Sequence, residues 1–195
     1  MPSTFTRRTL IAGSALIAAQ FALGGTALAL EGDKKHLRPP SAQDEDSFLA
    51  TCMKCGRCQS ACPQSCIRTG VLEDGLLSWR TPIMSFKRGY CDYCGKCALV
   101  CPTGAITETD AEKNRIGLAK IDPERCLAWT AGSSCLACVD ACPTGAITAD
   151  ASGRPVIEDA LCNGCGACER NCPSNSYRSF AGGTKRGVNV EHLQA

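Results

Sequence analysis

Apolar residues occur along this chain in short stretches between dense runs of cysteine. Two of these stretches share one pattern, in which an apolar residue or pair, a polar turn and a second apolar pair follow each other. That pattern predicts two short β-hairpins between cysteine runs. The predicted partners are Ile106 with Ile116–Leu118 over 105–122, and Ile147 with Val156–Ile157 over 146–159. Short strands separated by cysteine-rich loops and helices predict an α+β fold.

The first 29 residues have the parts of a signal peptide. Paired Arg7 and Arg8 precede an Ala- and Gly-rich apolar stretch that ends at the small residues of Ala27–Ala29. The arginine pair and the weak hydrophobicity favour a twin-arginine signal over an uncleaved membrane anchor or an ordinary cytosolic N-terminus. We therefore expect residues 1–29 to direct export to the periplasm through the twin-arginine translocase.

The remaining chain divides into three parts. Residues 30–48 carry Pro39, Pro40 and several charges, which predicts an extended tether. Residues 49–180 hold the cysteines, and Val71–Leu72 and Ile83–Phe86 within them suit short strands or a packing loop. Residues 181–195 are Gly-rich and polar, which predicts a flexible tail.

Sixteen of the 17 cysteines lie in four runs, each closed by proline. Three runs read C-x-x-C-x-x-C-x-x-x-C-P, which is the ligation run of bacterial [4Fe–4S] ferredoxins. The third run keeps its four cysteines but widens its first gap to eight residues. The four runs are Cys52, Cys55, Cys58 and Cys62; Cys91, Cys94, Cys97 and Cys101; Cys126, Cys135, Cys138 and Cys142; and Cys162, Cys165, Cys168 and Cys172.

The spacing favours a cubane cluster over a zinc site or a set of disulfide bonds. Zinc sites gather two Cys-x-x-Cys pairs across a longer loop, and closely spaced cysteines make poor disulfide partners. Glycine after the second cysteine, at Gly56, Gly95 and Gly166, lets the backbone approach an inorganic core. Four runs supply thiolates for four [4Fe–4S] clusters, and such clusters move single electrons.

In two-cluster ferredoxins the fourth cysteine of a run binds the other cluster. Runs two and three are followed by the same heptapeptide, at 101–107 and 142–148, whereas the segments after runs one and four resemble each other. This likeness favours nesting, with an inner unit over 88–150 inserted between outer halves 49–87 and 151–180. Sequential pairing, one with two and three with four, is the alternative. Nesting predicts the ligand sets Cys52, Cys55, Cys58 and Cys172; Cys91, Cys94, Cys97 and Cys142; Cys126, Cys135, Cys138 and Cys101; and Cys162, Cys165, Cys168 and Cys62.

Three residues outside the ligand pattern invite interpretation. Cys66 aligns with Ala105 and Ala146, so a small buried side chain is favoured over a redox or spare-ligand role. Trp129 lies in the wide gap of run three and could shield a cluster or dock a partner. Local packing is the preferred interpretation for Trp129 and for Trp79.

Several functions lack sequence support. The chain has two histidines, His36 and His192, both in predicted termini, and no His–carboxylate or Ser–His pattern. No nucleotide-binding glycine motif follows a strand. A formal net charge of +2 gives no indication of a nucleic-acid surface. The pattern predicts an electron carrier without a catalytic site of its own.

The chain resembles the NapG/MauM family of ferredoxin-type periplasmic proteins. The segments that carry the resemblance are Leu37-Arg38-Pro39-Pro40, Phe48 with run one, Ile116–Ala119 and the wide third run. The resemblance implies four [4Fe–4S] clusters and a NapH-like membrane partner that oxidises quinol. It also implies transfer of electrons to a periplasmic reductase, such as nitrate reductase, or to a cytochrome, or else a role in amine oxidation. Alternatives are an electron-transfer subunit of a molybdopterin oxidoreductase, a zinc-stabilised interaction module and a metalloenzyme maturation factor.

Overall fold

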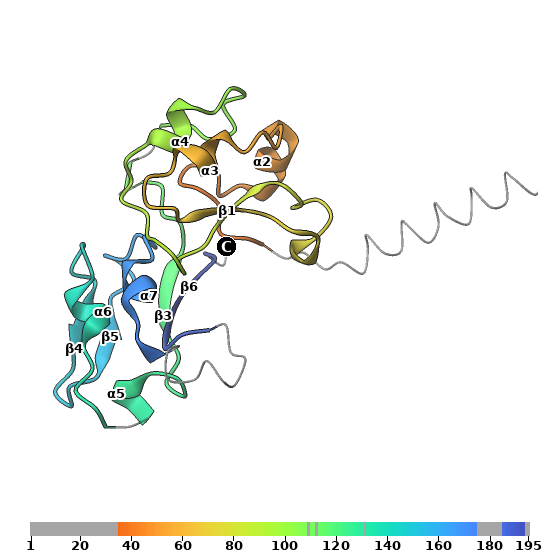
Figure 1. Ribbon diagram of the computed structural model, residues 1–195. Coiled ribbons are helices and arrows are strands. Elements are labelled where there is room, and N and C mark those ends of the chain that lie inside the picture. Colours follow the sequence, from red (N-terminus) through yellow and green to blue (C-terminus); the bar gives the residue numbers. More distant parts are fainter. Residues whose placement is uncertain (1–34, 109, 112, 131, 175–184, 194–195) are drawn as a thin grey trace, which may run out of the picture.

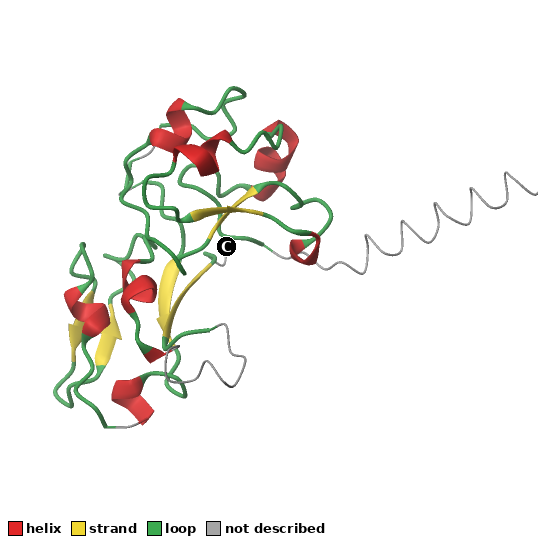
Figure 2. Ribbon diagram, viewed as in Figure 1, coloured by secondary structure: helices red, strands yellow, loops and turns green. Residues whose placement is uncertain are grey.

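Two lobes, each built around two cysteine runs, make up the structure (Figure 1). The computed structural model describes residues 35–108, 110–111, 113–130, 132–174 and 185–193. The regular elements are short and loops connect them (Figure 2). The predicted signal over 1–29 lies outside the described residues.

The first lobe contains the first two cysteine runs. Its strands β1 and β2 are antiparallel, with Ile67 opposite Met84 and Thr69 opposite Pro82. Helix α2 begins after Asp44, whose carboxylate accepts a hydrogen bond from the Ser47 N–H. The elements are α2 (Glu45–Thr51), α3 (Arg57–Ala61), β1 (Ile67–Thr69), η1 (Leu72–Asp74), β2 (Pro82–Met84) and α4 (Lys96–Leu99).

The second lobe contains the last two runs and confirms the second predicted hairpin. Strands β4 and β5 are antiparallel, with Ile147 opposite Ile157, and Gly153 takes a φ of 74° in the turn between them. Glycine adopts that backbone conformation without steric cost. The elements are β3 (Leu118–Ile121), α5 (Leu127–Thr130), α6 (Ala137–Asp140), β4 (Ile147–Ala149), β5 (Pro155–Ile157), α7 (Ala167–Asn171) and β6 (Val188–Glu191).

Two predictions are wrong: the hairpin over 105–122, and the flexible tail for residues 185–193, the part of the tail that the structure describes. Strand β3 pairs with β6 at the C-terminus, with Ala119 opposite Val190. In β6, Val188 and Val190 are buried, while Asn189 is partly exposed and Glu191 is exposed. This alternation gives the strand one apolar face, so residues 185–193 close the second lobe instead of fraying.

The predicted tether is also wrong for residues 35–48. Arg38, Pro39 and Pro40 are fully buried, and Phe48 of α2 belongs to the core. The Arg38 guanidinium forms an ion pair with Glu45 and lies 5.0 Å from the centre of the Phe48 ring. A buried arginine needs such partners, and they fix this segment against the first lobe.

Three helices of the cysteine runs begin in the same way, directly after a glycine with positive φ. The residue before α3, α4 and α7 is a glycine with φ of 76°, 69° and 79°, respectively: Gly56, Gly95 and Gly166. A side chain is disfavoured in that left-handed conformation. The turn lets each run change from a loop to a helix within one residue. In the described part of the chain, no helix is long and apolar enough to cross a membrane.

Candidate metal centres

The cysteine runs associate in sequential pairs. Helix α3 of run one packs against α4 of run two, and α6 of run three packs against α7 of run four. The two lobes of Figure 1 correspond to these two pairs. The predicted inner unit over 88–150, inserted between outer halves, is therefore wrong, because runs two and three lie in different lobes.

Three hollows are each lined by the first three cysteines of one run and the last cysteine of its partner. The space between protein atoms is similar in all three, about 340, 350 and 320 Å³. The first group is Cys52, Cys55, Cys58 and Cys101; the second is Cys91, Cys94, Cys97 and Cys62; and the third is Cys126, Cys135, Cys138 and Cys172.

The remaining four cysteines make the fourth group. Charges on Cys142 and Cys162 lie close enough to Cys165 to raise the pKa of its thiol, after the larger effect of burial. Burial, followed by the charges of Cys165 and Cys162, likewise raises the pKa of the Cys168 thiol. The fourth group thus repeats the pattern of the other three, with Cys142 supplied by run three.

The four ligand sets predicted from nesting are consequently wrong in their last member. Cys62 lies with run two and not with run four, and Cys101 lies with run one and not with run three. Cys172 lies with run three instead of run one, and Cys142 with run four instead of run two. All sixteen predicted cysteines are brought into groups of four, but with different partners.

Hydrogen bonds favour the thiolate form at the last cysteine of a run. The Cys66 thiol, followed by backbone N–H groups, lowers the pKa of Cys62 to about 6. Burial raises the pKa of Cys101, but the backbone N–H of Ile106 and the Thr103 hydroxyl outweigh burial and leave it below its usual value. Thiolates held by N–H donors are the ligands that an iron–sulfur cluster needs.

The third cysteine is buried in the first, third and fourth groups and partly buried in the second. Burial raises the pKa of Cys58, Cys97 and Cys138 to about 11 each, and neighbouring cysteine thiolates add to the effect. Four like-charged sulfurs that converge on one hollow are stable only with a cation among them, and a coordinated thiol is deprotonated outright. The donor set therefore fits a metal cluster in each group.

The groups form a continuous series in the order first, second, fourth, third. A charge on Cys58 of the first group affects the pKa of Cys97 of the second group. The backbone N–H of Cys91 donates to the carbonyl of Cys165 at 2.8 Å, which joins the second group to the fourth. Burial, followed by neighbouring cysteine charges that include Cys138 of the third group, raises the pKa of Cys168 of the fourth group.

Tyr93 reinforces the contact between the lobes. Its hydroxyl donates to the carbonyl of Asn163 at 2.6 Å, which connects runs two and four. Burial and then the charge of Cys91 raise the pKa of the Tyr93 phenol, so the hydroxyl stays a donor.

The structure resolves the residues outside the ligand pattern as follows. Cys66 is almost fully buried, as predicted, and lines the hollow of the second group. Trp129 of α5 is 38% exposed, with the Arg154 guanidinium 4.8 Å from its ring centre. Trp79 is 45% exposed, and local packing stays a prediction for both indoles. Across the described part of the chain, no three His, Cys, Asp or Glu side chains converge tightly enough to hold one single metal ion.

Comparison with known proteins identifies iron–sulfur domains across all four cysteine runs. The model of the 4Fe-4S dicluster domain matches residues 51–105, 90–146 and 132–176. A methylamine utilization ferredoxin-type protein MauM of Methylorubrum extorquens is 34% identical over 192 residues, with 88% of this chain and 86% of that protein covered. The ferredoxin-type protein NapG of Escherichia coli is 33% identical, with 86% and 79% covered. This chain belongs to the NapG/MauM family.

NapG/MauM membership makes the chain a ferredoxin-type iron–sulfur protein of electron transfer. The MauM of Paracoccus denitrificans, 35% identical over 188 residues, covers 86% of this chain and 83% of its own length. The wide third run is accommodated by α5, which begins directly after Cys126. Family membership and the four cysteine groups agree on the class of cofactor.

Proposed function

We propose that this protein carries electrons one at a time, in the periplasm, through four [4Fe–4S] clusters. The ligands of each cluster are the four cysteines of one group. The electrons come from a membrane iron–sulfur protein that oxidises quinol, of the NapH type, and go to a periplasmic reductase or cytochrome. The protein contributes no catalytic site of its own.

The observation that carries this proposal is the unbroken series of cysteine groups. A carrier with one cluster would need one group, and a metal-stapled fold would need no contact between groups. Here each group adjoins the next through named atoms, and the series crosses from one lobe to the other at Cys91 and Cys165. When bound, each cluster accepts and releases one electron.

The residues around each group hold the cofactor and adjust its energy. Backbone N–H groups directed at the last cysteine stabilise negative charge there. Third cysteines lie at the contacts between groups, and those of the first, third and fourth groups are buried away from water. Burial lowers the local dielectric and so strengthens the effect of each hydrogen bond on the reduction potential.

Iron and acid-labile sulfide on anaerobically purified protein, with EPR after stepwise reduction, test the proposal. We expect about 16 iron and 16 sulfide per chain and magnetic interaction between neighbouring clusters. Eight or fewer iron atoms, or zinc in place of iron, would contradict a relay of four clusters. Export is tested separately with Arg7→Lys and Arg8→Lys together, for which we expect loss of periplasmic protein.

A further inference from the structure

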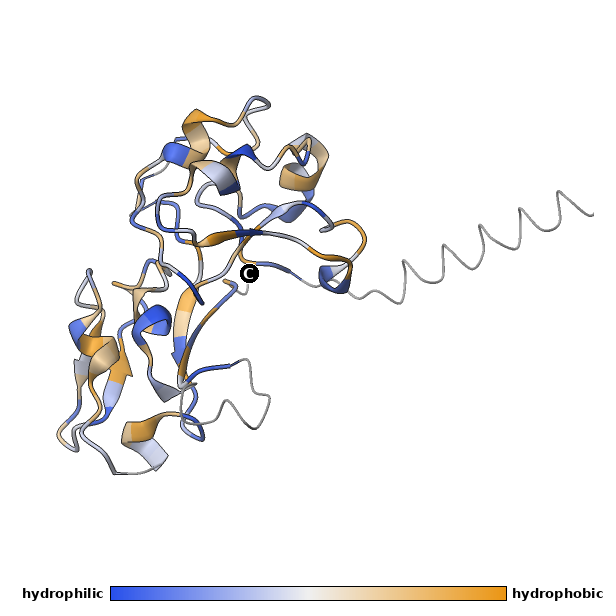
Figure 3. Ribbon diagram, in the orientation of Figure 1, coloured by the Kyte–Doolittle hydropathy of each residue, from blue (hydrophilic) through white to orange (hydrophobic). Residues whose placement is uncertain are grey.

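The connection between β1 and β2 presents apolar side chains to solvent. We call residues 71–79 the apolar loop. Its five large apolar side chains are between 45% and 64% exposed: Val71, Leu72, Leu76, Leu77 and Trp79. Apolar segments of this loop are visible at the edge of the first lobe (Figure 3). Five large apolar side chains exposed within nine residues are unusual on a protein surface, and exposed apolar patches mark interaction sites.

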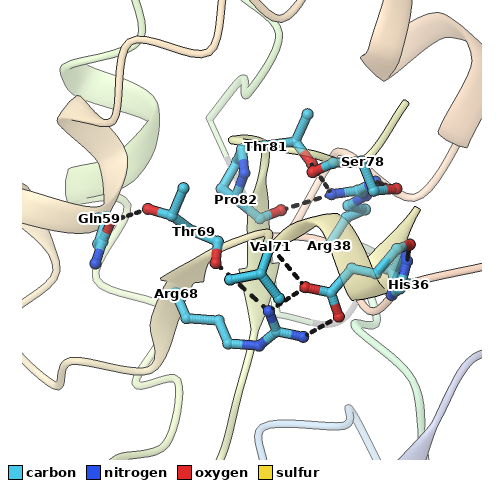
Figure 4. A network of polar contacts seen from close by, with 10 residues as sticks. His36, Arg38, Gln59, Arg68, Thr69, Val71, Ser78, Thr81 and Pro82 are labelled. Carbon is cyan, nitrogen blue, oxygen red and sulfur yellow. Dashed lines mark hydrogen bonds and ion pairs between the residues drawn. The ribbon is translucent and has the colours of Figure 1, made fainter. Parts of the chain in front are cut away.

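Polar contacts hold the apolar loop in shape from inside (Figure 4). The Arg68 guanidinium donates to Asp74 at 2.5 and 2.7 Å, and the Val71 N–H donates to Asp74 at 2.8 Å. Buried Arg38 donates to the hydroxyl of Ser78 at 3.1 Å. Because these bonds fix the backbone of the loop, the apolar side chains are kept outside at a definite place instead of collapsing onto the core.

The loop lies where the N-terminal segment meets the fold. His36 forms a hydrogen bond with the Asp74 carbonyl at 2.7 Å, and the described chain begins one residue earlier, beside η1 (Figure 1). In the sequence, the apolar stretch that ends at Ala29 comes just before this point. The leader predicted from the sequence therefore joins the fold beside this loop.

Basic side chains border the loop and connect it to the first cysteine group. Lys54, which lies between Cys52 and Cys55, donates its ammonium to the Leu77 carbonyl at 3.0 Å. Arg80 directly follows the loop and is exposed, as is Lys35, the neighbour of His36, and Glu73 is the exposed acidic residue within the loop. Leucine and tryptophan beside lysine and arginine are the side chains that bind the headgroup region of anionic bilayers.

We propose that the apolar loop binds the surface of an anionic lipid bilayer and thereby turns the first cysteine group toward the membrane. This inference rests on the proposed relay, because it specifies which end of the series faces the quinol-oxidising partner. Electrons then enter at the first group and leave at the third, in the second lobe. The occupant is the lipid surface itself, and an apolar protein face is an alternative that the test separates.

Sedimentation with vesicles tests the loop. The holoprotein from residue 30 onward keeps every residue of the described fold and removes the apolar leader. We expect it to bind vesicles of phosphatidylcholine with phosphatidylglycerol, more weakly at high salt. Replacing Leu72, Leu77 and Trp79 by Ser together should reduce binding at least tenfold. The matched control is Val156→Ser with Leu161→Ser, which alters comparably exposed residues of the second lobe and should leave binding unchanged.

The outcomes separate this inference from the relay. Absence of vesicle binding, or equal loss in the second-lobe control, would overturn a lipid-facing loop. Binding only to vesicles that carry a membrane protein would assign the loop to a protein partner and also overturn it. Iron content and EPR of the same samples report on the relay independently, so a loop that fails leaves the four clusters testable on their own.

A second inference comes from the hydrogen-bond partners of the last cysteines. In three runs the residue two positions later places a hydroxyl near the sulfur, at 3.7, 3.5 and 3.2 Å, respectively: Cys101 with Thr103, Cys142 with Thr144, and Cys172 with Ser174. Run one has Gln64 at that position instead. Its partner is Cys66, whose sulfur lies 3.5 Å from the sulfur of Cys62.

We infer that Cys66 is a positioning residue that donates its S–H to Cys62 and adjusts the reduction potential of the second group alone. The inference rests on the proposed clusters. A hydrogen bond to a ligand sulfur stabilises the more negative, reduced state and raises the potential. Because a thiol is a weaker donor than a hydroxyl, the second cluster receives less stabilisation from this position than the others.

Potentials from EPR-monitored titration test this role. Cys66→Ala should lower the potential of one cluster, and Cys66→Ser should raise it above the wild-type value, with iron content unchanged in both. Thr144→Val is the matched control and should lower the potential of a different cluster, that of the fourth group. Unchanged potentials in both Cys66 variants would overturn the inference. Loss of a cluster in Cys66→Ala would do so too, because it would make Cys66 a ligand.

Discussion

The Tyr93 hydroxyl lies 2.6 Å from the Asn163 carbonyl, and this bond joins a residue between two cysteines of run two to a residue between two cysteines of run four. The Cys91 N–H, which donates to the Cys165 carbonyl, lies in the same contact. The lobes therefore meet through the peptide loops that surround the second and fourth groups. Their relative position is fixed at the place where an electron crosses between them in the proposed relay.

Tyr93→Phe should loosen this contact without changing the number of clusters. The change removes one bond to the Asn163 carbonyl, which still accepts from the Ile116 N–H at 3.0 Å, so we expect a cost of about 0.5–1.5 kcal/mol of stability. We expect faster hydrogen exchange in the backbone around residues 163–165 and weaker magnetic interaction between two clusters. Tyr90→Phe is the control, because Tyr90 lies in the same lobe and has no described bond to run four. Equal exchange in both variants would contradict this role for Tyr93.

Sequential pairing is tested by asking which cysteines alter the same cluster. Cys101→Ser should change the EPR signal that Cys52→Ser and Cys55→Ser change, because all three belong to the first group. Nesting would instead make Cys101→Ser and Cys135→Ser alter one common signal. The measurement is a comparison of EPR spectra of the four full-length variants after identical reduction.

Gly166→Ala should destabilise the protein more than Gly95→Ala. Each glycine has a positive φ and directly precedes a helix, so the backbone strain of an alanine is similar at the two positions. A Cβ on Gly166 would lie 2.1 Å from the Phe86 ring, whereas nothing lies within 4 Å of one on Gly95. Overpacking adds about 1–3 kcal/mol. The rate of cluster loss in denaturant measures the difference, and equal rates would show that Phe86 moves aside.

Arg38→Met should be strongly destabilising. Arg38 is fully buried and donates to Thr81 at 2.7 Å and to the Pro82 carbonyl at 2.9 Å, besides its pair with Glu45. Removing one partner of a buried pair costs about 3–5 kcal/mol. Arg154→Met, on the exposed face over Trp129, should cost little. Urea unfolding followed by loss of cluster absorbance compares the two.

The sequence predicts the cysteine ligands because their spacing is local, but it does not predict their partners. The shared heptapeptide after runs two and three specifies a turn, in which Thr103 and Thr144 approach the sulfurs of their own runs. A turn of this kind carries no information on which run lies opposite. Likeness between these segments therefore misled the assignment of pairs.

Contacts that are distant in sequence account for the other differences. Strand β6 pairs with β3 across about seventy residues, and β6 alternates over only four residues. Arg38 looks like part of a charged linker until Ser78, Thr81 and Pro82 are placed around it. The β4–β5 hairpin is predicted correctly because its strands are separated by a single turn. The β3–β6 pairing and the contacts of Arg38 are not predicted because they join residues far apart in the sequence.

The division of cysteines between the lobes also bears on how the protein is synthesised. All eight cysteines of the first and second groups have been translated once Cys101 is added. A nested chain would have kept its two outer ligand sets incomplete until Cys168 and Cys172. In the sequential arrangement, the ligand sets of both proposed clusters of the first lobe are complete before the second lobe is translated.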